Sequence, residues 1–224
     1  KLGAEISYEK GDVVLTAKKL KAARIKFRFP SVGATENLIM CASLIEGRTV
    51  LENCAREPEI ADLAAALKKM GAGINGEGTA RIEITGSPRL KGLKHSVMPD
   101  RIETGTFMLA CAAAGGRVRL SGTAPKNVDA LTGHLRLAGI KVSVFKDALE
   151  INSSGGRPRP VSVLTGPYPG FPTDLQAPWM AFMARARGVC SVNERIFENR
   201  FMHAAELGRM GACISVADKK ARIQ

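Results

Sequence analysis

A single acid, Asp174, lies in the proline-rich stretch PYPGFPTDLQAP, which runs from residue 167 to residue 178. A free carboxylate is a weak base, but one that is held in place can accept a proton as a new bond forms. The prolines restrict the backbone that leads into the predicted helix. Thr173 and Gln176 have the spacing of a capping box at a helix start. The stretch therefore predicts a pinned first-turn acid, which is either structural or a catalytic base.

Two further proline-led helix starts, FPSVGATEN and MPDRIETGT, occupy equivalent places in the chain. In each, a proline precedes a residue that can cap a helix, Ser31 in the first and Asp100 in the second. The free N–H groups of a helix N-terminus favour anions, and glycine at Gly33 and Gly105 would let a ligand approach the backbone. Three such starts around one cleft would bind phosphates, whereas three caps facing water would do no chemistry.

These helix starts belong to a unit that repeats about every seventy residues. Glycine recurs in LKKMGAGI, LRLAGIKV and LGRMGACI as Gly71, Gly139 and Gly211, and Gly3 in KLGAEI marks the end of an earlier copy. Each copy predicts an amphipathic helix, a short strand, a second helix that ends at the marker glycine, and a β-hairpin, with a strand leading in. The pattern predicts an α/β protein of βαβαββ units.

A basic stretch that ends in proline, LKGLKHSVMP, follows the first complete unit. It predicts a boundary between residues 1–98, which hold the earlier tail and one unit, and residues 99–224, which hold two units. Because a domain does not normally begin in the middle of a repeat, we expect the 224 residues to be a segment of a longer protein.

The chain is basic, with 33 lysines and arginines against 21 acids and a formal charge of +12. This is either a solvated surface or a sign of anionic partners. The basic residues are scattered and aromatics are few, which favours phosphorylated small molecules over nucleic acid. No apolar run could span a membrane and no signal peptide is visible. The five cysteines lack a CxxC pair, so we expect neither disulfides nor a metal site, and a reducing compartment such as the cytoplasm.

The second helix of the third copy differs from its equivalents. Counting back from the marker glycines places His203 where the other copies have Leu63 and Leu131, and Arg200 where they also have apolar residues. Either the alignment is shifted by one residue, or long side chains snorkel, or the stretch NERIFENRFMH faces a site instead of a core.

Taken in order, FPSVGATEN, AREPEI, DRIETGTF, PYPGFPTDLQAP and IFENRFMH resemble the UDP-N-acetylglucosamine enolpyruvyl transferases, over essentially the whole chain. The resemblance implies the inside-out α/β barrel of that family, with an active site in the cleft between two domains. It implies a bacterial, cytoplasmic transferase that moves the enolpyruvyl group of phosphoenolpyruvate to the 3′-hydroxyl of UDP-N-acetylglucosamine, without metal or cofactor. The resemblance implies that this reaction is the first committed step of peptidoglycan synthesis. The enzyme would therefore serve cell-wall biogenesis, cell shape and cell division.

The resemblance also assigns roles to individual residues. Asp174 matches the carboxylate that acts on the sugar hydroxyl. The matched substrate-binding positions are Phe29, Pro30, Ser31, Val32, Gly33, Asp174 and Ile196, and further charged site positions are Glu57, Asp100, Glu198 and Arg200. At Phe29 many members of the family have a basic residue instead.

Three parts of the family's machinery match nothing in this sequence: the acid on a mobile loop, a Lys-Asn pair and a C-terminal arginine. We therefore expect N- and C-terminal parts of the same enzyme to be needed, and little or no turnover by these residues alone. Two alternatives stay open. One is enolpyruvylshikimate-phosphate synthase, whose own signatures are not seen here. The other is a non-catalytic basic module that binds phosphate or RNA, since the RNA phosphate cyclases have similar repeats.

Overall fold

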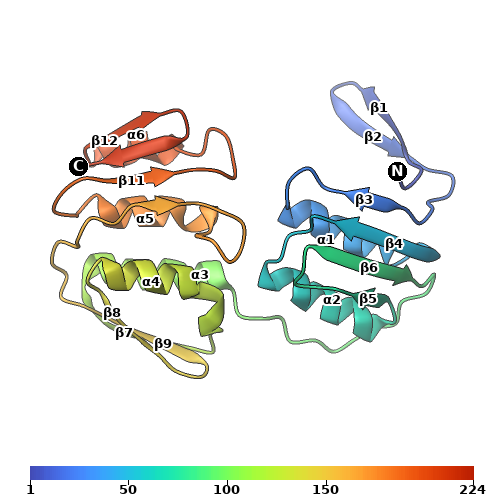
Figure 1. Ribbon diagram of the computed structural model, residues 1–224, viewed down its shortest axis with the longest axis horizontal. Coiled ribbons are helices and arrows are strands. Elements are labelled where there is room, and N and C mark those ends of the chain that lie inside the picture. The colour runs from blue at the N-terminus through green and yellow to red at the C-terminus, as the bar shows by residue number, and fades with distance from the viewer. The chain divides into compact units, whose positions relative to one another are not determined.

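The computed structural model describes the whole chain, residues 1–224, and divides into two compact units, residues 1–97 and 98–224 (Figure 1). Each unit encloses its own cluster of buried apolar side chains. None of the helices combines the length and the apolar character needed to cross a membrane.

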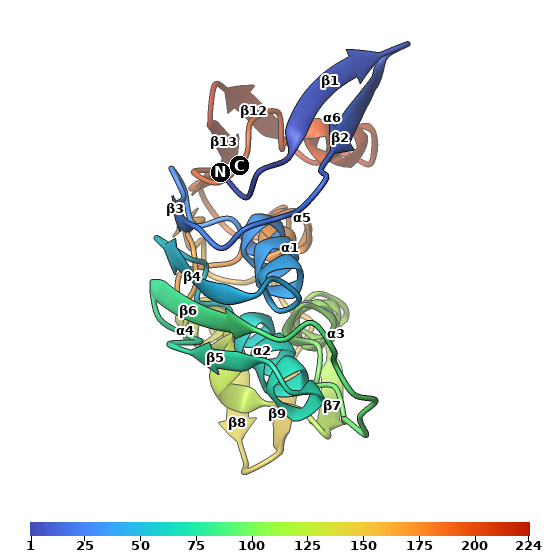
Figure 2. The same ribbon diagram turned by 90° about the vertical axis from the view of Figure 1, so that its right-hand side faces the viewer.

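The first unit holds one complete copy of the repeat and a preceding hairpin. Its elements are β1 (Glu5–Glu9), β2 (Asp12–Thr16), β3 (Arg24–Lys26), α1 (Val32–Ala42), β4 (Gly47–Glu52), α2 (Pro58–Met70), β5 (Gly73–Asn75) and β6 (Arg81–Gly86). The main sheet has the order β3-β4-β6-β5, with β3 parallel to β4 and the other pairs antiparallel (Figure 2). This copy therefore has the predicted βαβαββ order, while β1 and β2 form a separate, exposed hairpin.

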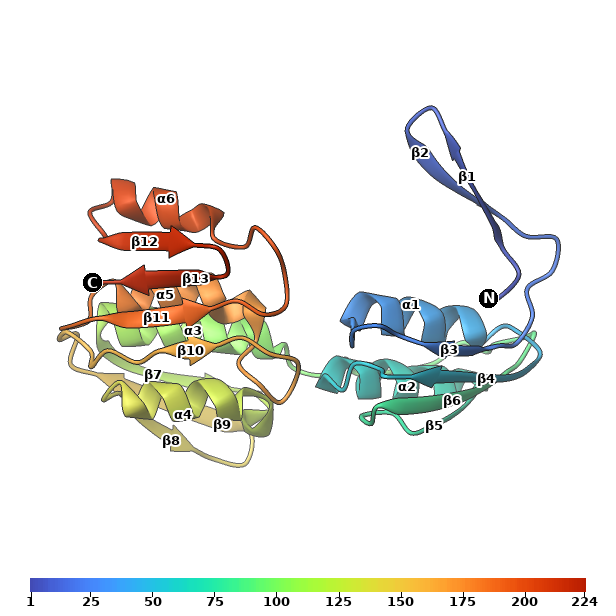
Figure 3. The same ribbon diagram turned by 45° about the horizontal axis from the view of Figure 1, so that its top comes forward.

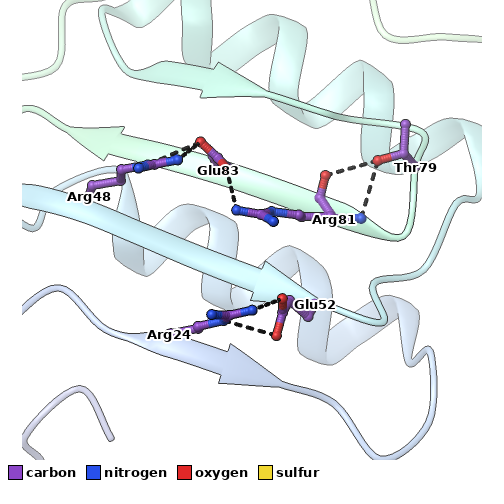
Figure 4. A network of polar contacts seen from close by, with 6 residues as sticks. All are labelled: Arg24, Arg48, Glu52, Thr79, Arg81 and Glu83. Atoms are coloured by element: carbon purple, nitrogen blue, oxygen red, sulfur yellow. Dashed lines mark hydrogen bonds and ion pairs between the residues drawn. The ribbon is translucent and has the colours of Figure 1, made fainter.

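The sheet of the first unit separates an apolar face from a charged one. Strands β4 and β6 alternate, so that Leu51 and Ile82 are fully buried towards α1 and α2 while their neighbours point outward. On the outer face, arginines from three strands pair with Glu52 and Glu83 (Figure 4). Helix α2 ends as the sequence predicts, because Gly71 adopts the left-handed conformation with φ of 113°.

The second unit holds two copies of the repeat. Its elements are α3 (Arg101–Ala114), β7 (Gly116–Ser121), the 3₁₀ turn η1 (Pro125–Val128), α4 (Asp129–Leu137), β8 (Lys141–Val144), β9 (Ala148–Ser153), β10 (Val163–Leu164), the 3₁₀ turn η2 (Thr173–Leu175), α5 (Gln176–Met183), β11 (Cys190–Asn193), α6 (Met202–Arg209), β12 (Ile214–Ala217) and β13 (Lys220–Ile223). They form two sheets, β7-β9-β8 and β10-β11-β13-β12 (Figure 3). The second of these repeats the topology of the first unit's main sheet.

One sequence expectation is wrong for the copy that begins with α3. It has no leading strand, because residues 87–100 form neither helix nor strand and the sheet contains only β7, β9 and β8. Within the second unit, α3 packs on β7, β9 and α5, while α5 packs on β11. Helices α3 and α5 therefore lie inside the unit, around a core that includes Met108, Leu135 and Trp179, whereas α6 has only Ala204 buried.

Candidate active site

The start of α1 is built as its sequence predicts. Ser31 is the N-cap, and its Oγ accepts a hydrogen bond from the backbone N of Ala34 at 3.3 Å. The hydroxyl of Thr35 donates to the carbonyl oxygen of Ser31 at 2.7 Å, which closes the first turn. Val32 begins the helix, Pro30 precedes the cap, and the side chain of Phe29 is exposed.

The glycines at the two helix starts do different work. A Cβ added at Gly33 would meet no atom within 4 Å, so the backbone of α1 is open there to a ligand. A Cβ at Gly105 would lie 2.5 Å from Cδ1 of Leu175 and 3.1 Å from Cδ2 of Leu131. The expectation that Gly105 admits a ligand is therefore wrong, because this buried glycine makes room for neighbouring leucines in the core.

Asp100 caps α3, as the sequence predicts. Its Oδ1 accepts from the backbone N of Ile102 at 2.7 Å and of Glu103 at 3.1 Å. Thr104 then donates to the carbonyl oxygen of Asp100 at 2.7 Å, the same contact that Thr35 makes in α1. The two starts are thus equivalent in geometry as well as in sequence.

The third start does not contain the predicted capping box. The residue in the cap position is Pro172, which has no side-chain donor or acceptor, and the first turn is the 3₁₀ turn η2. Thr173 and Gln176 are both buried and turn inward, away from the free N–H groups of their own helix. Both donate instead to the carboxylate of Glu194, at 2.8 Å and 3.1 Å.

Asp174 lies between these two anchored residues in the sequence, and its side chain points to the surface. Its side chain is 50% exposed, and its Oδ1 accepts a hydrogen bond and ion pair from Nη2 of Arg200 at 2.9 Å. The guanidinium of Arg200 also lies over the ring of Phe197, 5.3 Å from its centre. The structure thus brings together Asp174 and Arg200, two of the residues proposed from sequence.

Glu194 is the residue at this site that the sequence analysis missed. It is only 1% exposed, and five groups donate to its carboxylate: the hydroxyls of Thr165 and Thr173, the backbone N of Ile196 and Phe197, and Nε2 of Gln176. A buried charge of this kind is rare unless it is fully hydrogen-bonded. The only signal in the sequence is an acid directly after a short strand, which is too weak to single it out.

The loop after β11 carries the remaining predicted residues of the second unit. Ile196 is half-buried, and its backbone N donates to Oε1 of Glu194 at 2.7 Å. Glu198 is 84% exposed and its Oε1 lies 4.0 Å from Nζ of Lys219, whereas the ion pair of Arg200 is with Asp174. Asn199 has a positive φ of 53°, which turns the chain before Arg200.

For the second helix of the third copy, the structure supports a one-residue shift of the repeat alignment, but only just before the helix begins. Phe201 is buried and takes the core place that the alignment gave to Arg200, whereas Ala204 is buried like its equivalent, Ala64. His203 is half-buried, with Nε2 3.1 Å from the sulfur of Met180. Burial, with a smaller effect from the charge of Arg200, lowers the pKa of His203 below its usual range.

An acidic cluster lies near the starts of both helices of the first unit. Glu57 is buried directly before α2. Desolvation, helped by the charges of Glu59 and Glu57, raises the pKa of Glu36 above its usual range. No group of histidine, cysteine or acidic residues in the chain has the arrangement of a metal site.

Two solved structures with a similar fold are enzymes of the enolpyruvyl transferase class. The enolpyruvyl transferase NikO from Streptomyces tendae is similar over the whole of this chain and 56% of the NikO chain, with a TM-score of 0.88 and 24% sequence identity. EPSP synthase from Acinetobacter baumannii is similar over the whole of this chain and 54% of the synthase chain, with a TM-score of 0.67 and 19% identity. At these identities the likeness defines the fold, which is the α/β fold of the enolpyruvyl transferases.

The sequence comparisons identify the family. The family model of EPSP synthase (3-phosphoshikimate 1-carboxyvinyltransferase) matches residues 1–224, and the chain belongs to this family. UDP-N-acetylglucosamine 1-carboxyvinyltransferases are 50% identical in Elusimicrobium minutum, 49% in Allorhizobium ampelinum and 48% in Geobacter metallireducens, each over the full chain. The chain spans about half the length of these curated relatives, 53%, 52% and 53% respectively.

Proposed function

We propose that the protein to which these residues belong transfers the enolpyruvyl group of phosphoenolpyruvate to the 3′-hydroxyl of UDP-N-acetylglucosamine, in the bacterial cytoplasm and as a step of peptidoglycan synthesis. The relatives that are about half identical over the full chain are named for this acceptor. The observation that carries the proposal is the half-exposed carboxylate of Asp174, which lies on an anchored first turn. Its Oδ1 is paired with Nη2 of Arg200 at 2.9 Å.

Asp174 is the proposed base. Arg200 binds Oδ1 of Asp174, which leaves Oδ2 for the sugar hydroxyl. As the hydroxyl oxygen forms a bond to C2 of phosphoenolpyruvate, its proton passes to Asp174, and C3 receives a proton from an acid of the protein. Loss of a proton from C3 and cleavage of the bond between C2 and the phosphate oxygen then release phosphate and leave the enolpyruvyl ether. A carboxylate fixed in place suits this concerted transfer.

The start of α1 is the proposed contact for the phosphates of the nucleotide. Ser31 already caps the helix, so the open backbone at Val32 and Gly33 is what can face an anion. A helix N-terminus offers N–H donors and a positive potential there. Phe29 and Pro30 would contact the nucleotide through their apolar surfaces, and Ile196 would contact its sugar.

The remaining charged positions receive narrower proposals. Arg200 would stabilise negative charge that develops near Asp174. Asp100 would act through the helix start that it caps, since Oδ1 is already bound to two N–H groups. Glu57 would contribute charge beside the start of α2 in the first unit, and Glu198 would contribute charge on the loop after β11.

The test uses a chimera in which residues 1–224 replace the matching part of the Elusimicrobium minutum relative. Phosphate release from phosphoenolpyruvate would be measured with UDP-N-acetylglucosamine and, separately, with shikimate 3-phosphate, because the family model is named for the second acceptor. We expect turnover with the sugar nucleotide alone. Turnover only with shikimate 3-phosphate, or none with either, would contradict the proposal.

Two controls use the 224-residue chain alone. It should release no phosphate above background, because the resemblance places the acid outside these residues. A titration with UDP-N-acetylglucosamine and with RNA at several salt concentrations tests the rival binding module. RNA binding with a steep salt dependence, and no response to the sugar nucleotide, would favour that rival.

A further inference from the structure

We propose that Glu194 is a positioning residue for the proposed reaction, because its one buried carboxylate holds both the turn that displays Asp174 and the loop that carries Ile196 and Arg200. The inference rests on the proposed function of Asp174. Glu194 itself is 1% exposed and cannot contact a substrate, so its role is to act through its neighbours.

The two oxygens of Glu194 bind three segments of the chain. Oε1 accepts from the backbone N of Ile196 at 2.7 Å and of Phe197 at 3.2 Å, and from the hydroxyl of Thr165 at 2.8 Å. Oε2 accepts from Thr173 at 2.8 Å and from Gln176 at 3.1 Å. The carboxylate therefore links the loop after β11 to the start of α5, which are also joined by the ion pair of Arg200 with Asp174.

Asp174 depends on this link because little else fixes it. Its side chain is half-exposed and its single hydrogen-bond partner is Arg200, which belongs to the same loop that Glu194 holds. The residue before Asp174 and the residue two positions after it are both bound to Oε2. Both members of the pair of Asp174 and Arg200 thus follow the position of one carboxylate.

The chemistry of the cluster explains why an acid occupies this position. All five groups around Glu194 are hydrogen-bond donors. Because a carboxylate only accepts, each of them has an acceptor. An apolar residue would leave these buried groups unsatisfied, which is costly. A glutamine keeps the shape but directs an N–H₂ group at donors on one side, so the Thr173 hydroxyl or the Gln176 amide must turn.

A merely structural role would lower stability without a specific effect on turnover, and two variants with a matched control separate these cases. Thr173→Val removes one buried hydroxyl that donates to Oε2, and Glu194→Gln removes the charge. The control is Ser153→Ala, which also loses a buried hydroxyl: this hydroxyl donates to the carbonyl oxygen of Ala112 at 3.0 Å and accepts from the backbone N of Gly155 at 3.2 Å, and it bonds to neither Asp174 nor Glu194. Thermal midpoints would be recorded for all three.

In the active chimera, we expect kcat to fall about tenfold in Thr173→Val and about a hundredfold in Glu194→Gln, since small misplacements of a reacting group have effects of this size. In Glu194→Gln the KM for UDP-N-acetylglucosamine should also rise, because Ile196 loses its anchor. Ser153→Ala should keep kcat and KM despite a similar loss in thermal midpoint. Equal kcat in Thr173→Val and Ser153→Ala would overturn the inference.

Failure of the proposed function would be seen separately, as an inactive unsubstituted chimera. The anchoring is then measured in the 224-residue chain by hydrogen exchange at the amides of Ile196 and Phe197, which donate to Oε1. Exchange should be at least about tenfold faster in Glu194→Gln and unchanged in Ser153→Ala. Unchanged exchange in Glu194→Gln would overturn the inference whatever the chimera does.

Discussion

The three helix starts that the repeat makes equivalent are held in two different ways. At α1 and α3, Ser31 and Asp100 bind the N–H groups of their own helices, and a threonine one turn later closes the turn. At the third start the cap position is Pro172, and the nearby polar side chains bind Glu194 instead. The first turn at the third start is therefore held by contacts outside its own helix, and Asp174 on that turn pairs with Arg200, whereas Ser31 and Asp100 are bound to their own helices.

The largest expected effect is at the displayed acid. In the chimera, Asp174→Asn should lower kcat about a thousandfold, because the amide cannot accept the hydroxyl proton. The free energy of unfolding should change by less than about 1 kcal/mol, since a half-exposed ion pair contributes little. Steady-state kinetics and thermal unfolding of the same sample measure both quantities. A kcat near that of the unsubstituted chimera would remove Asp174 from the mechanism.

The matched control for Asp174→Asn is the capped start of α3. Asp100→Asn keeps a cap, because asparagine is as good an N-cap as aspartate. We therefore expect a much smaller change in kcat than at Asp174. An equal loss at the two positions would show that the two starts do not differ in the way their hydrogen bonds indicate.

The sequence predicted the two starts that depend on local contacts and failed at the one that does not. Ser31 and Asp100 bind groups within four residues, so their spacing alone reveals them. Thr173 has the same spacing to Gln176, but its partner Glu194 lies 21 residues further along the chain. A local pattern cannot reveal a competing buried acceptor, which forms only when β11 packs beside α5.

The glycines give the same lesson about what local sequence can show. The marker glycine Gly71 was correctly predicted because a helix end is a local event. Gly33 is the second residue of α1 and Gly105 is the fifth residue of α3, and the first is open whereas the second is packed against Leu131 and Leu175. These contacts come from other elements of the core, so no periodicity within α3 could distinguish the two.

An intermediate effect is expected at these two glycines. Gly105→Ala should destabilise the chain by about 2 kcal/mol, because the added methyl group overlaps leucine side chains in a packed core. Gly33→Ala should stabilise it by about 0.5 kcal/mol, since α1 gains a better helix former and no contact is disturbed. Denaturant unfolding of both variants measures the difference, and a loss of stability in Gly33→Ala would contradict it.

One of these variants, Gly33→Ala, also tests the proposed phosphate contact. Gly33→Ala should weaken binding of UDP-N-acetylglucosamine, since its methyl group would occupy the open space beside the start of α1. Binding would be followed by calorimetric titration of the chimera. Undiminished affinity in Gly33→Ala would remove the close approach of the nucleotide to this backbone.

The smallest expected effect is at His203, which stands where the other copies have leucine. Burial and the charge of Arg200 lower the pKa of His203 in the folded chain, so the fold disfavours the charged form. The unfolded chain then binds more protons as the pH falls below about 6.5. The stability that the neutral histidine contributes is therefore present above that pH and is lost as the pH falls through the lowered pKa of the folded state.

The variant His203→Leu isolates this contribution, because every other titrating group is kept. Between about pH 7.5 and pH 5.5, its thermal midpoint should fall less than that of the unsubstituted chain. Arg200→Ala should raise the pKa of His203 partway towards its usual value, since burial, the larger cause, remains. An NMR titration of the imidazole would measure this directly. Identical pH dependence in the leucine variant and the unsubstituted chain would show that His203 behaves energetically like the leucines of the other two copies.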